Sequence, residues 1–275
     1  MTPKKKNNTI HHTNQSLSVH VSLTGLSFLI TSEATSETLH FSEINFITPA
    51  TPEELLLEIE KALTSKEDLQ TNFENINVVY ATDLYTIVPE SLFDENKASE
   101  YLKFNAKILA NDFIASDVVK DHPMVVVYVP FININNFFFD RFGSFTYYHA
   151  VTILLEKILH SEEQGINPKM YINVNKEHVD CIIVDGNSLQ LCNTYNFKTP
   201  EDFIYYILFA FEQLKLNPET TQTIVMGAIN FEDDTYAMLY TYIRHISLFE
   251  DATGISIDSE ANHQHIILKS LASCE

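Results

Sequence analysis

Glycine is scarce in this sequence, at six of 275 residues. Turns that wrap around phosphate groups use several glycines, because a residue without a side chain lets the backbone amides come close to the ligand. A glycine-rich phosphate loop is therefore disfavoured. The Gly-x-Ser-x-Gly motif of serine hydrolases is also absent, and no other residue set forms a catalytic signature. We therefore predict no catalytic residues.

Cysteine is almost as rare, and the three cysteines lack metal-ligand spacing. Cys181 and Cys192 can lie on adjacent strands, where two small buried side chains are expected in a cytosolic protein rather than a disulfide. Histidines are more numerous, but the close pair His263 and His265 has no cysteine or second histidine pair at ligand spacing. We predict no metal and no cofactor.

Basic residues are few, with 17 Lys and Arg against 37 Asp and Glu, which gives a formal net charge of -20. Such a surface disfavours nucleic acid and anionic lipid as partners. The one basic cluster is Lys4-Lys5-Lys6, within a polar segment, residues 1–15, that we predict to be a disordered tail. No apolar run resembles a signal peptide or approaches a membrane span. A cytoplasmic protein without membrane insertion is expected.

One pattern occurs twice. Thr51-Pro52-Glu53-Glu54 opens an amphipathic segment at residues 52–63, and Thr199-Pro200-Glu201-Asp202 opens another at residues 200–216. In both copies threonine can cap the free amides, proline occupies the first helical position, and acidic residues lie at the positive end of the helix dipole. Both segments are predicted helices.

Each repeated helix follows three short segments of alternating hydrophobicity, within residues 17–46 and 169–197. A strand–strand–strand–helix unit used twice at long spacing predicts two lobes. The polar segment at residues 162–168 carries Gly165 and Pro168 and is the best boundary. We predict a tail at 1–15, a first lobe at 16–164 and a second lobe at 165–275.

The other elements follow from periodicity. Further helices are predicted at residues 94–104, 131–142, 147–160 and 234–245, and further strands at 76–80, 85–88, 124–129 and 223–226. The unbroken apolar run at 124–129 predicts a strand covered on both faces. Residues 255–257 and 265–268 are short strands or a closing helix. Glu232-Asp233-Asp234 is interpreted as the acidic start of a helix rather than a carboxylate site.

This order of elements, used twice, resembles the plan of the actin-like ATPase superfamily, an α/β fold with mixed sheets and two ribonuclease H-like lobes. Three sequence segments resemble those of an uncharacterised bacterial family, domain of unknown function 3822. They are Tyr85-Thr86-Ile87-Val88-Pro89-Glu90-Ser91-Leu92-Phe93-Asp94, Tyr101-Leu102-Lys103-Phe104-Asn105 and Asn262-His263-Gln264-His265. The resemblance spans roughly residue 17 to the C-terminus. In general plan that family is distantly similar to the cytoplasmic actin-like component of type IV pilus assembly.

The resemblance implies ATP binding between the lobes through two hairpin turns, each with an Asp for magnesium and with glycines. Here the first turn offers the hydroxyls of Ser22 and Thr24 but no carboxylate. The second turn offers Lys176 and Glu177 without Asp or Gly, and the expected Gly-Gly pair for adenosine is reduced to Gly227. All three elements are degenerate, so hydrolysis is disfavoured, while Lys176 keeps anion binding open.

Aromatic residues are in surplus on two predicted helices. Phe137-Phe138-Phe139 sweep about 200° of a helix, so one core cannot receive all three rings. The second repeat helix, residues 200–216, is apolar nearly all round, which indicates burial on every side by the lobes or by a partner. We predict that at least one ring of either set makes a contact between lobes or between chains; the second set is Tyr205, Tyr206 and Phe209.

Two hypotheses follow. The first is a non-catalytic actin-like protein that acts through protein–protein contact or self-association. The alternative is a nucleotide- or anion-binding enzyme, similar to a small-molecule kinase, that uses the cleft between the lobes. Its residues would be Glu177 or Asp185 with Lys176, Gly227 and the first-turn hydroxyls of Ser22 and Thr24.

Overall fold

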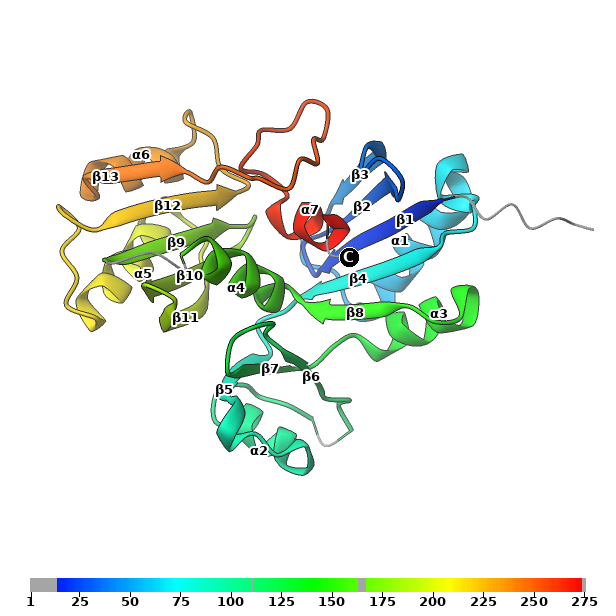
Figure 1. Ribbon diagram of the computed structural model, residues 1–275, viewed down its shortest axis with the longest axis horizontal. Helices are drawn as coiled ribbons and strands as arrows, with labels where there is room; N and C mark the ends of the chain where they lie inside the picture. Colours follow the sequence, from blue (N-terminus) through cyan, green and yellow to red (C-terminus); the bar gives the residue numbers. More distant parts are fainter. Residues whose placement is uncertain (1–13, 110, 163–166, 274–275) are drawn as a thin grey trace, which may run out of the picture.

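Two five-stranded mixed sheets of the same plan form the body of the protein, as the computed structural model shows (Figure 1). The structure describes residues 14–109, 111–162 and 167–273. The strand orders are β3-β2-β1-β4-β8 and β11-β10-β9-β12-β13. The first sheet comprises β1 (Gln15–Ser22), β2 (Gly25–Ser32), β3 (Thr38–Asn45), β4 (Asn75–Ala81) and β8 (Thr146–His149). The second comprises β9 (Pro168–Val174), β10 (His178–Asp185), β11 (Ser188–Asn196), β12 (Gln222–Gly227) and β13 (His245–Leu248).

The pairing directions are duplicated too. In each sheet the first three strands are antiparallel, and the fourth strand pairs in parallel with the first strand and with the fifth. This confirms the predicted duplicated α/β fold. Most of the predicted tail, residues 1–13, lies outside the described residues, and Gln15 already belongs to β1.

Both repeated helices begin at the predicted threonine. The N-cap of α1 (Pro52–Ser65) is Thr51, whose hydroxyl accepts from the Glu54 amide while the Glu54 carboxylate accepts from the Thr51 amide. Thr199 and Asp202 make the same reciprocal pair at α5 (Pro200–Gln213). Each capping box satisfies two amides that lack helical partners, so each fixes where its helix starts.

A small subdomain, residues 85–128, is inserted after β4 and lies below the two sheets in Figure 1. Its three strands have the order β5-β7-β6, with β5 (Tyr85–Pro89), β6 (Ala115–Val118) and β7 (Met124–Tyr128), and α2 (Ala98–Lys103) packs on it. The side chains of β7 are buried alternately in two different clusters, so this strand is covered on both faces as predicted. It is central in the small sheet rather than in a main sheet.

Several element boundaries differ from prediction. The helix predicted at 147–160 begins only at α4 (Ala150–Ser161), because Tyr147 and Tyr148 belong to β8. The predicted helix at 94–104 is a 3₁₀ turn, Glu95–Lys97, followed by α2. The helix predicted at 234–245 stops earlier, as α6 (Asp234–Tyr242), and β13 follows it. Helix α3 (Ile132–Phe142) matches its prediction closely.

The two sheets share one hydrophobic cluster, and the second sheet has a further cluster of its own. Ile182, Val184 and Met226 of the second sheet belong to the same buried cluster as Val19 and Tyr80 of the first. The closing helix α7 (Ile266–Ser273) contacts β1, β2, β4 and α4, so it packs on the first sheet although it follows the second in sequence (Figure 1). The lobe boundaries at 164 and 165 remain a prediction.

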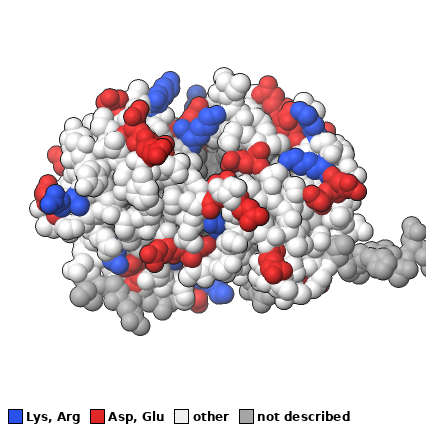
Figure 2. All heavy atoms as spheres, turned by 90° about the horizontal axis from the view of Figure 1, so that it is seen from above, with Lys and Arg blue, Asp and Glu red and all other residues white. Residues whose placement is uncertain are grey.

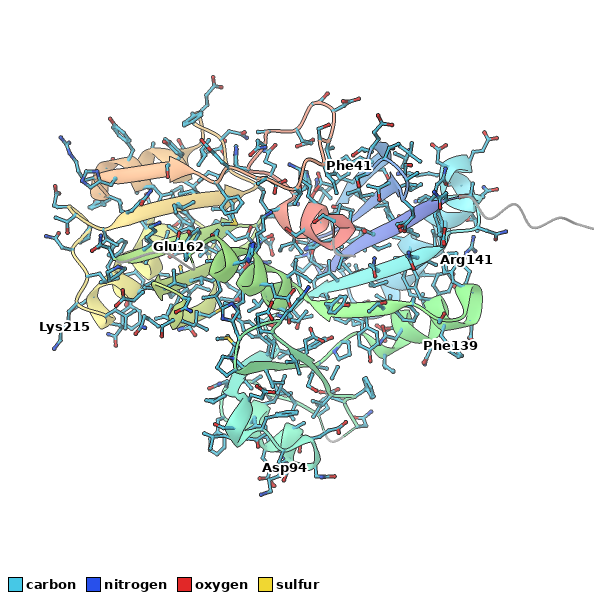
Figure 3. All side chains as sticks on the ribbon, viewed as in Figure 1. Phe41, Asp94, Phe139, Arg141, Glu162 and Lys215 are labelled. Atoms are coloured by element: carbon cyan, nitrogen blue, oxygen red, sulfur yellow. The ribbon has the colours of Figure 1, made fainter. Side chains whose placement is uncertain are left out.

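The phenylalanine run on α3 divides as the helix geometry requires. Phe138 is fully buried, with ring contacts to Phe137, Phe142 and Phe145. Phe139 is 64% exposed and points away from the fold in Figure 3. One core takes one ring of the run completely and leaves its neighbour to solvent.

Helix α5 is not buried on all sides within this chain. Phe203, Ile207 and Phe211 are in the core of the second sheet, whereas Tyr205 is 62% exposed and stacks on Phe209.

The view in Figure 2 shows that acidic side chains, with fewer basic ones among them, are spread over the face seen from above.

Candidate functional site

The turn after β1 and the turn after β9 face one cleft of about 960 Å³. Of the residues predicted for the alternative enzyme site, Ser22, Thr24, Lys176 and Glu177 all line this cleft. Gly227 and Asp185 do not line it. Asp185 ends β10, whose first residue, His178, lies at the cleft, so about seven residues of strand, roughly 23 Å, separate it from the site.

The hydroxyls of the first turn are engaged in holding that turn. Ser22 Oγ lies 3.2 Å from Thr24 Oγ1 and donates to the Gly25 carbonyl at 3.1 Å. At Gly25, a Cβ atom would lie 2.8 Å from the Ile44 carbonyl oxygen. The glycine therefore allows β3 to approach β2, which is a structural requirement.

The lysine of the second turn reaches across to the first lobe. Lys176 Nζ donates to the carbonyl of Phe46, which follows β3. The turn itself is closed by the Asn175 amide, which donates to the His178 carbonyl at 2.9 Å. Lys176 thus links the second turn to the segment that follows β3.

Gly227 serves a close backbone crossing. Its φ is +88°, and a Cβ atom would lie 2.2 Å from the Val174 carbonyl oxygen, so no other residue fits there. Its amide donates to the His263 carbonyl at 2.9 Å. This amide therefore holds the segment that precedes α7.

A buried carboxylate stands behind the cleft, in a position that the sequence prediction missed. Asp180 is 4% exposed and accepts from Thr194 Oγ1 at 2.6 Å and from Asn173 Nδ2 at 2.9 Å. Asn175 Nδ2 lies 3.3 Å from the same oxygen as Asn173. Thr194 Oγ1 also contacts the Tyr85 hydroxyl at 3.1 Å, so the network ties β10 to the inserted subdomain. The sequence signal that could have identified Asp180 is that it is the one acidic residue within the apolar run of β10.

Asp83 was also missed. It follows β4, is exposed, and lines the cleft together with Glu177 and Asp202. Asp202 is committed to the cap of α5, which leaves Asp83 and Glu177 as the carboxylates facing the cleft from opposite lobes. Its position at the carboxyl end of a parallel strand, where ligands bind in α/β sheets, could have identified it.

Two buried titratable groups meet at the start of α4, beside the cleft residue Thr82. His149 Nδ1 accepts from the Val151 amide at 3.2 Å, so its Nε2 carries the proton donated to the Thr82 carbonyl at 3.0 Å. Burial lowers the pKa of His149 to about 4. Asp117 accepts from the His149 amide and the Thr152 hydroxyl, and burial raises the pKa of its carboxyl to about 6.

Metal and membrane sites find no support in the described part of the chain. Among residues 14–109, 111–162 and 167–273, no group of three or more His, Cys, Asp or Glu could hold a metal ion. Within the same residues, every helix is too short or too polar to cross a bilayer. Cys181 and Cys192 are free thiols; Cys181 is buried as predicted, whereas Cys192 is only partly buried.

The cleft therefore offers hydroxyls, the opposed carboxylates of Asp83 and Glu177, and two lysines, of which Lys176 is bonded to the Phe46 carbonyl and Lys198 is the other. Neither turn carries the aspartate or the paired glycines that would hold a magnesium–phosphate group.

Comparison with known proteins agrees with this fold. A family model described as "Protein of unknown function (DUF3822)" matches residues 4–246. A protein of Bacteroides thetaiotaomicron with an actin-like ATPase fold and unknown function has 20% identity and a TM-score of 0.81, covering 98% of this chain and all of that one. A chain of the PilM–PilN type IV pilus biogenesis complex has 11% identity and a TM-score of 0.58, covering 94% and 97% of the two chains. No curated protein sequence matches the chain.

Proposed function

The chain belongs to the DUF3822 family and has the actin-like ATPase fold, and on these grounds we propose that it is a non-catalytic actin-like protein that acts through protein–protein contact. The observation that carries this proposal is the state of the hairpin turns. The first turn has one glycine and no carboxylate, the second has Glu177 in place of an aspartate and no glycine, and Lys176 is bonded to the opposite lobe.

Two further observations support action through a partner. The fold is shared with PilM, which is described in a complex with PilN. The chain also leaves large rings in solvent, among them Tyr205, Tyr240 and Phe231, each more than 60% exposed. Exposed aromatic side chains are typical of interface cores.

We further propose a cytoplasmic site of action, which the free thiols of Cys181 and Cys192 on adjacent strands support.

Thermal unfolding with and without millimolar Mg-ATP tests the proposal. A ligand that binds only the folded state raises the melting temperature, so we expect no rise. A clear rise that disappears in Lys176→Ala would overturn the proposal, because the nucleotide would then occupy the cleft. A rise that persists in Lys176→Ala and in Glu177→Gln would place nucleotide outside this cleft and leave the cleft itself non-functional.

A second candidate function is favoured by the volume of the cleft. Side chains do not fill the space between the lobes, and Ser22, Thr24, Lys176 and Glu177 meet there. A nucleotide- or anion-binding enzyme similar to a small-molecule kinase would need Lys176 to leave the Phe46 carbonyl for a phosphate. Titration calorimetry with inorganic phosphate and with Mg-ATP measures this directly, and binding that is lost in Lys176→Ala would favour this candidate.

A further inference from the structure

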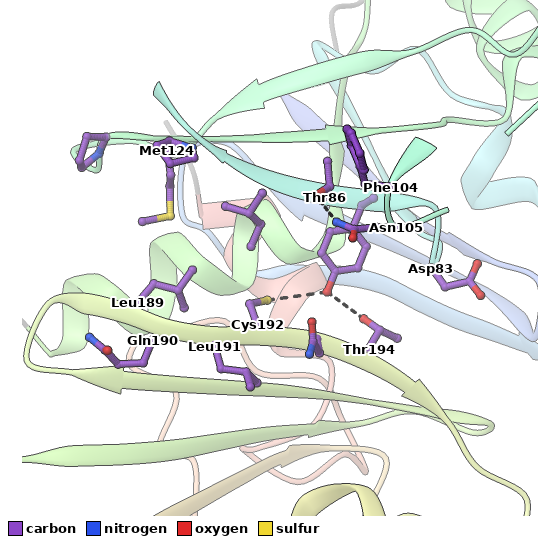
Figure 4. A pocket seen from close by; sticks show the side chains of 15 residues that line it. Asp83, Thr86, Phe104, Asn105, Met124, Leu189, Gln190, Leu191, Cys192 and Thr194 are labelled. Atoms are coloured by element: carbon purple, nitrogen blue, oxygen red, sulfur yellow. Dashed lines mark hydrogen bonds between the residues drawn. The ribbon is translucent and has the colours of Figure 1, made fainter. Parts of the chain in front are cut away.

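A second groove, of about 730 Å³, lies between the inserted subdomain and β11 (Figure 4). One wall is formed by β5 with Phe104 and Asn105, and the other by residues 189–194 of β11. One end is narrowed by the Tyr85 hydroxyl, which contacts Thr194 Oγ1 at 3.1 Å and Cys192 Sγ at 3.7 Å. The groove includes none of the residues of the two hairpin turns, and it shares only Asp83 and Thr194 with the cleft described above.

Both walls are edge strands. β5 is at one end of the order β5-β7-β6, and β11 is at one end of the second main sheet. An edge strand presents backbone N–H and C=O groups that have no partner within its own sheet. Two strands with such a free edge therefore line one groove.

The register identifies which backbone groups of β5 point away from β7, toward its free edge. The Val129 amide donates to the Leu84 carbonyl, and the Glu90 amide donates to the Pro123 carbonyl, so the even-numbered residues of β5 bond to β7. In antiparallel pairs bonded and unbonded residues alternate. The odd residues, Tyr85, Ile87 and Pro89, therefore direct their backbone groups away from β7. Proline at one of these positions fits, because its missing N–H costs no ladder bond there.

The same argument applies to β11. The Phe197 amide donates to the Glu177 carbonyl, and the pairing with β10 continues in register through Asn193 and Leu191. The alternate residues Cys192 and Thr194 direct their backbone groups to the free edge. Within the described chain, no backbone hydrogen bond outside the ladders engages the outward groups of Ile87, Cys192 or Thr194.

The side chains of the groove restrict its occupant further. Asp83 is the one charged side chain among the described residues that line it, and it is exposed. Phe104, which is 88% exposed, contributes an apolar surface together with Met124 and Leu189. A second copy of this chain is disfavoured, because each copy carries a net charge of -20.

We propose that this groove binds an extended segment of a partner protein by strand addition. Donors and acceptors that alternate at strand spacing on both walls suit a polypeptide backbone. The five residues of β5 span about 17 Å, which accommodates a segment of about five residues. The segment carries a Lys or Arg beside Asp83 and apolar side chains against Phe104 and Met124. This inference rests on the proposed function, since it supplies the surface on which the protein contact takes place.

Phage-displayed random eight-residue peptides, selected on the full chain, provide the probe. A selected peptide, synthesised with a fluorescent label, is then titrated by fluorescence polarisation. Ile87→Pro removes one outward amide without removing a bond to β7, and we expect it to weaken binding at least tenfold. Ile87→Val retains the amide and is the matched control, with unchanged affinity. Asp83→Lys changes an exposed side chain and should also weaken binding at least tenfold, which keeps the test valid if Ile87→Pro fails to fold.

Hydrogen exchange locates the bound peptide. Slower exchange of the Ile87, Cys192 and Thr194 amides in the complex supports the proposal. It is overturned if selection yields no binding peptide, if selected peptides bind Ile87→Pro and Asp83→Lys as tightly as wild type, or if light scattering shows a dimer that Ile87→Pro dissociates. Peptides that bind elsewhere on the protein would contradict the groove proposal but not the proposed function. The proposed function is tested separately, by the effect of Mg-ATP on the melting temperature.

Discussion

His149 and Asp117 lie together at the start of α4, and the folding equilibrium depends on their protonation in opposite directions. His149 is 1% exposed, and burial lowers its pKa from 6.5 to about 4. Asp117 is 9% exposed, and burial raises its pKa from 3.8 to about 6. Both groups are buried deeply enough for these shifts to contribute to the free energy of unfolding.

The signs follow from which state binds the proton more tightly. The unfolded state protonates His149 first, so the contribution of His149 is present above pH 6.5 and is lost as the pH falls toward 4. The folded state protonates Asp117 first, so its contribution is present at low pH and is lost as the pH rises through 6. Between pH 7 and pH 5, His149 lowers the free energy of unfolding by about 2 kcal/mol and Asp117 raises it by about 1 kcal/mol.

Single variants should separate these opposed effects. Urea unfolding, followed through the fluorescence of the 13 tyrosines, gives the free energy of unfolding at pH 7 and at pH 5. The quantity to compare is the free energy of unfolding at pH 5 minus that at pH 7. Relative to wild type, His149→Gln should raise this difference by about 2 kcal/mol, and Asp117→Asn should lower it by about 1 kcal/mol. His245→Gln removes an exposed histidine and is the control. Wild-type pH dependence in both buried variants, or the opposite signs, would refute this reasoning.

Three other perturbations have distinct expected outcomes. Phe138→Ala should lower the free energy of unfolding by about 3–5 kcal/mol, and Phe139→Ala by less than about 0.5 kcal/mol, in urea titrations; equal losses would mean that α3 is rotated. Gly227→Ala should destabilise by more than about 1 kcal/mol, because its φ is +88° and the Val174 carbonyl leaves no space, and an unchanged melting temperature would contradict this. Burial raises the pKa of Cys192 to about 12, so in a Cys274→Ser background the native protein should react with iodoacetamide at pH 8 far more slowly than the urea-unfolded protein, and equal rates would contradict this.

The predictable part of the fold is where local chemistry and long-range packing agree. The helix starts at Thr51 and Thr199 could be predicted because a capping box is formed by residues that are close in sequence. Alternating hydrophobicity likewise identifies the antiparallel strands of both sheets. The duplication of these signals led to the two-sheet architecture that the structure has.

The missed elements are short strands whose formation depends on distant partners. β8 has four residues, and its tyrosines fit a helix equally well until β4 is placed beside it. β6 reads Ala-Ser-Asp-Val, a polar segment that becomes a strand by pairing with β7. Tertiary contacts decide such segments, and periodicity over four residues is too short to indicate them.

The meeting of the two turns at one cleft was predictable, whereas the hydrogen bonds within that cleft were not. The two turns meet at one cleft, as the resemblance implied, and four predicted residues line it. The bond from Lys176 to the Phe46 carbonyl depends on how the lobes pack, which no local pattern encodes. The edge of β11 became a candidate surface only when the inserted subdomain was seen beside it.

The measurement that tests the central claim most directly is phosphate release from Mg-ATP by the purified protein. Asp83 and Glu177 are the free carboxylates that face the cleft, so the double variant Asp83→Asn, Glu177→Gln removes the acids that could position magnesium or water. A non-catalytic protein predicts that wild type and the double variant release phosphate at the same rate as buffer. Release above that rate by wild type, abolished in the double variant, would contradict the claim and make the cleft an active site.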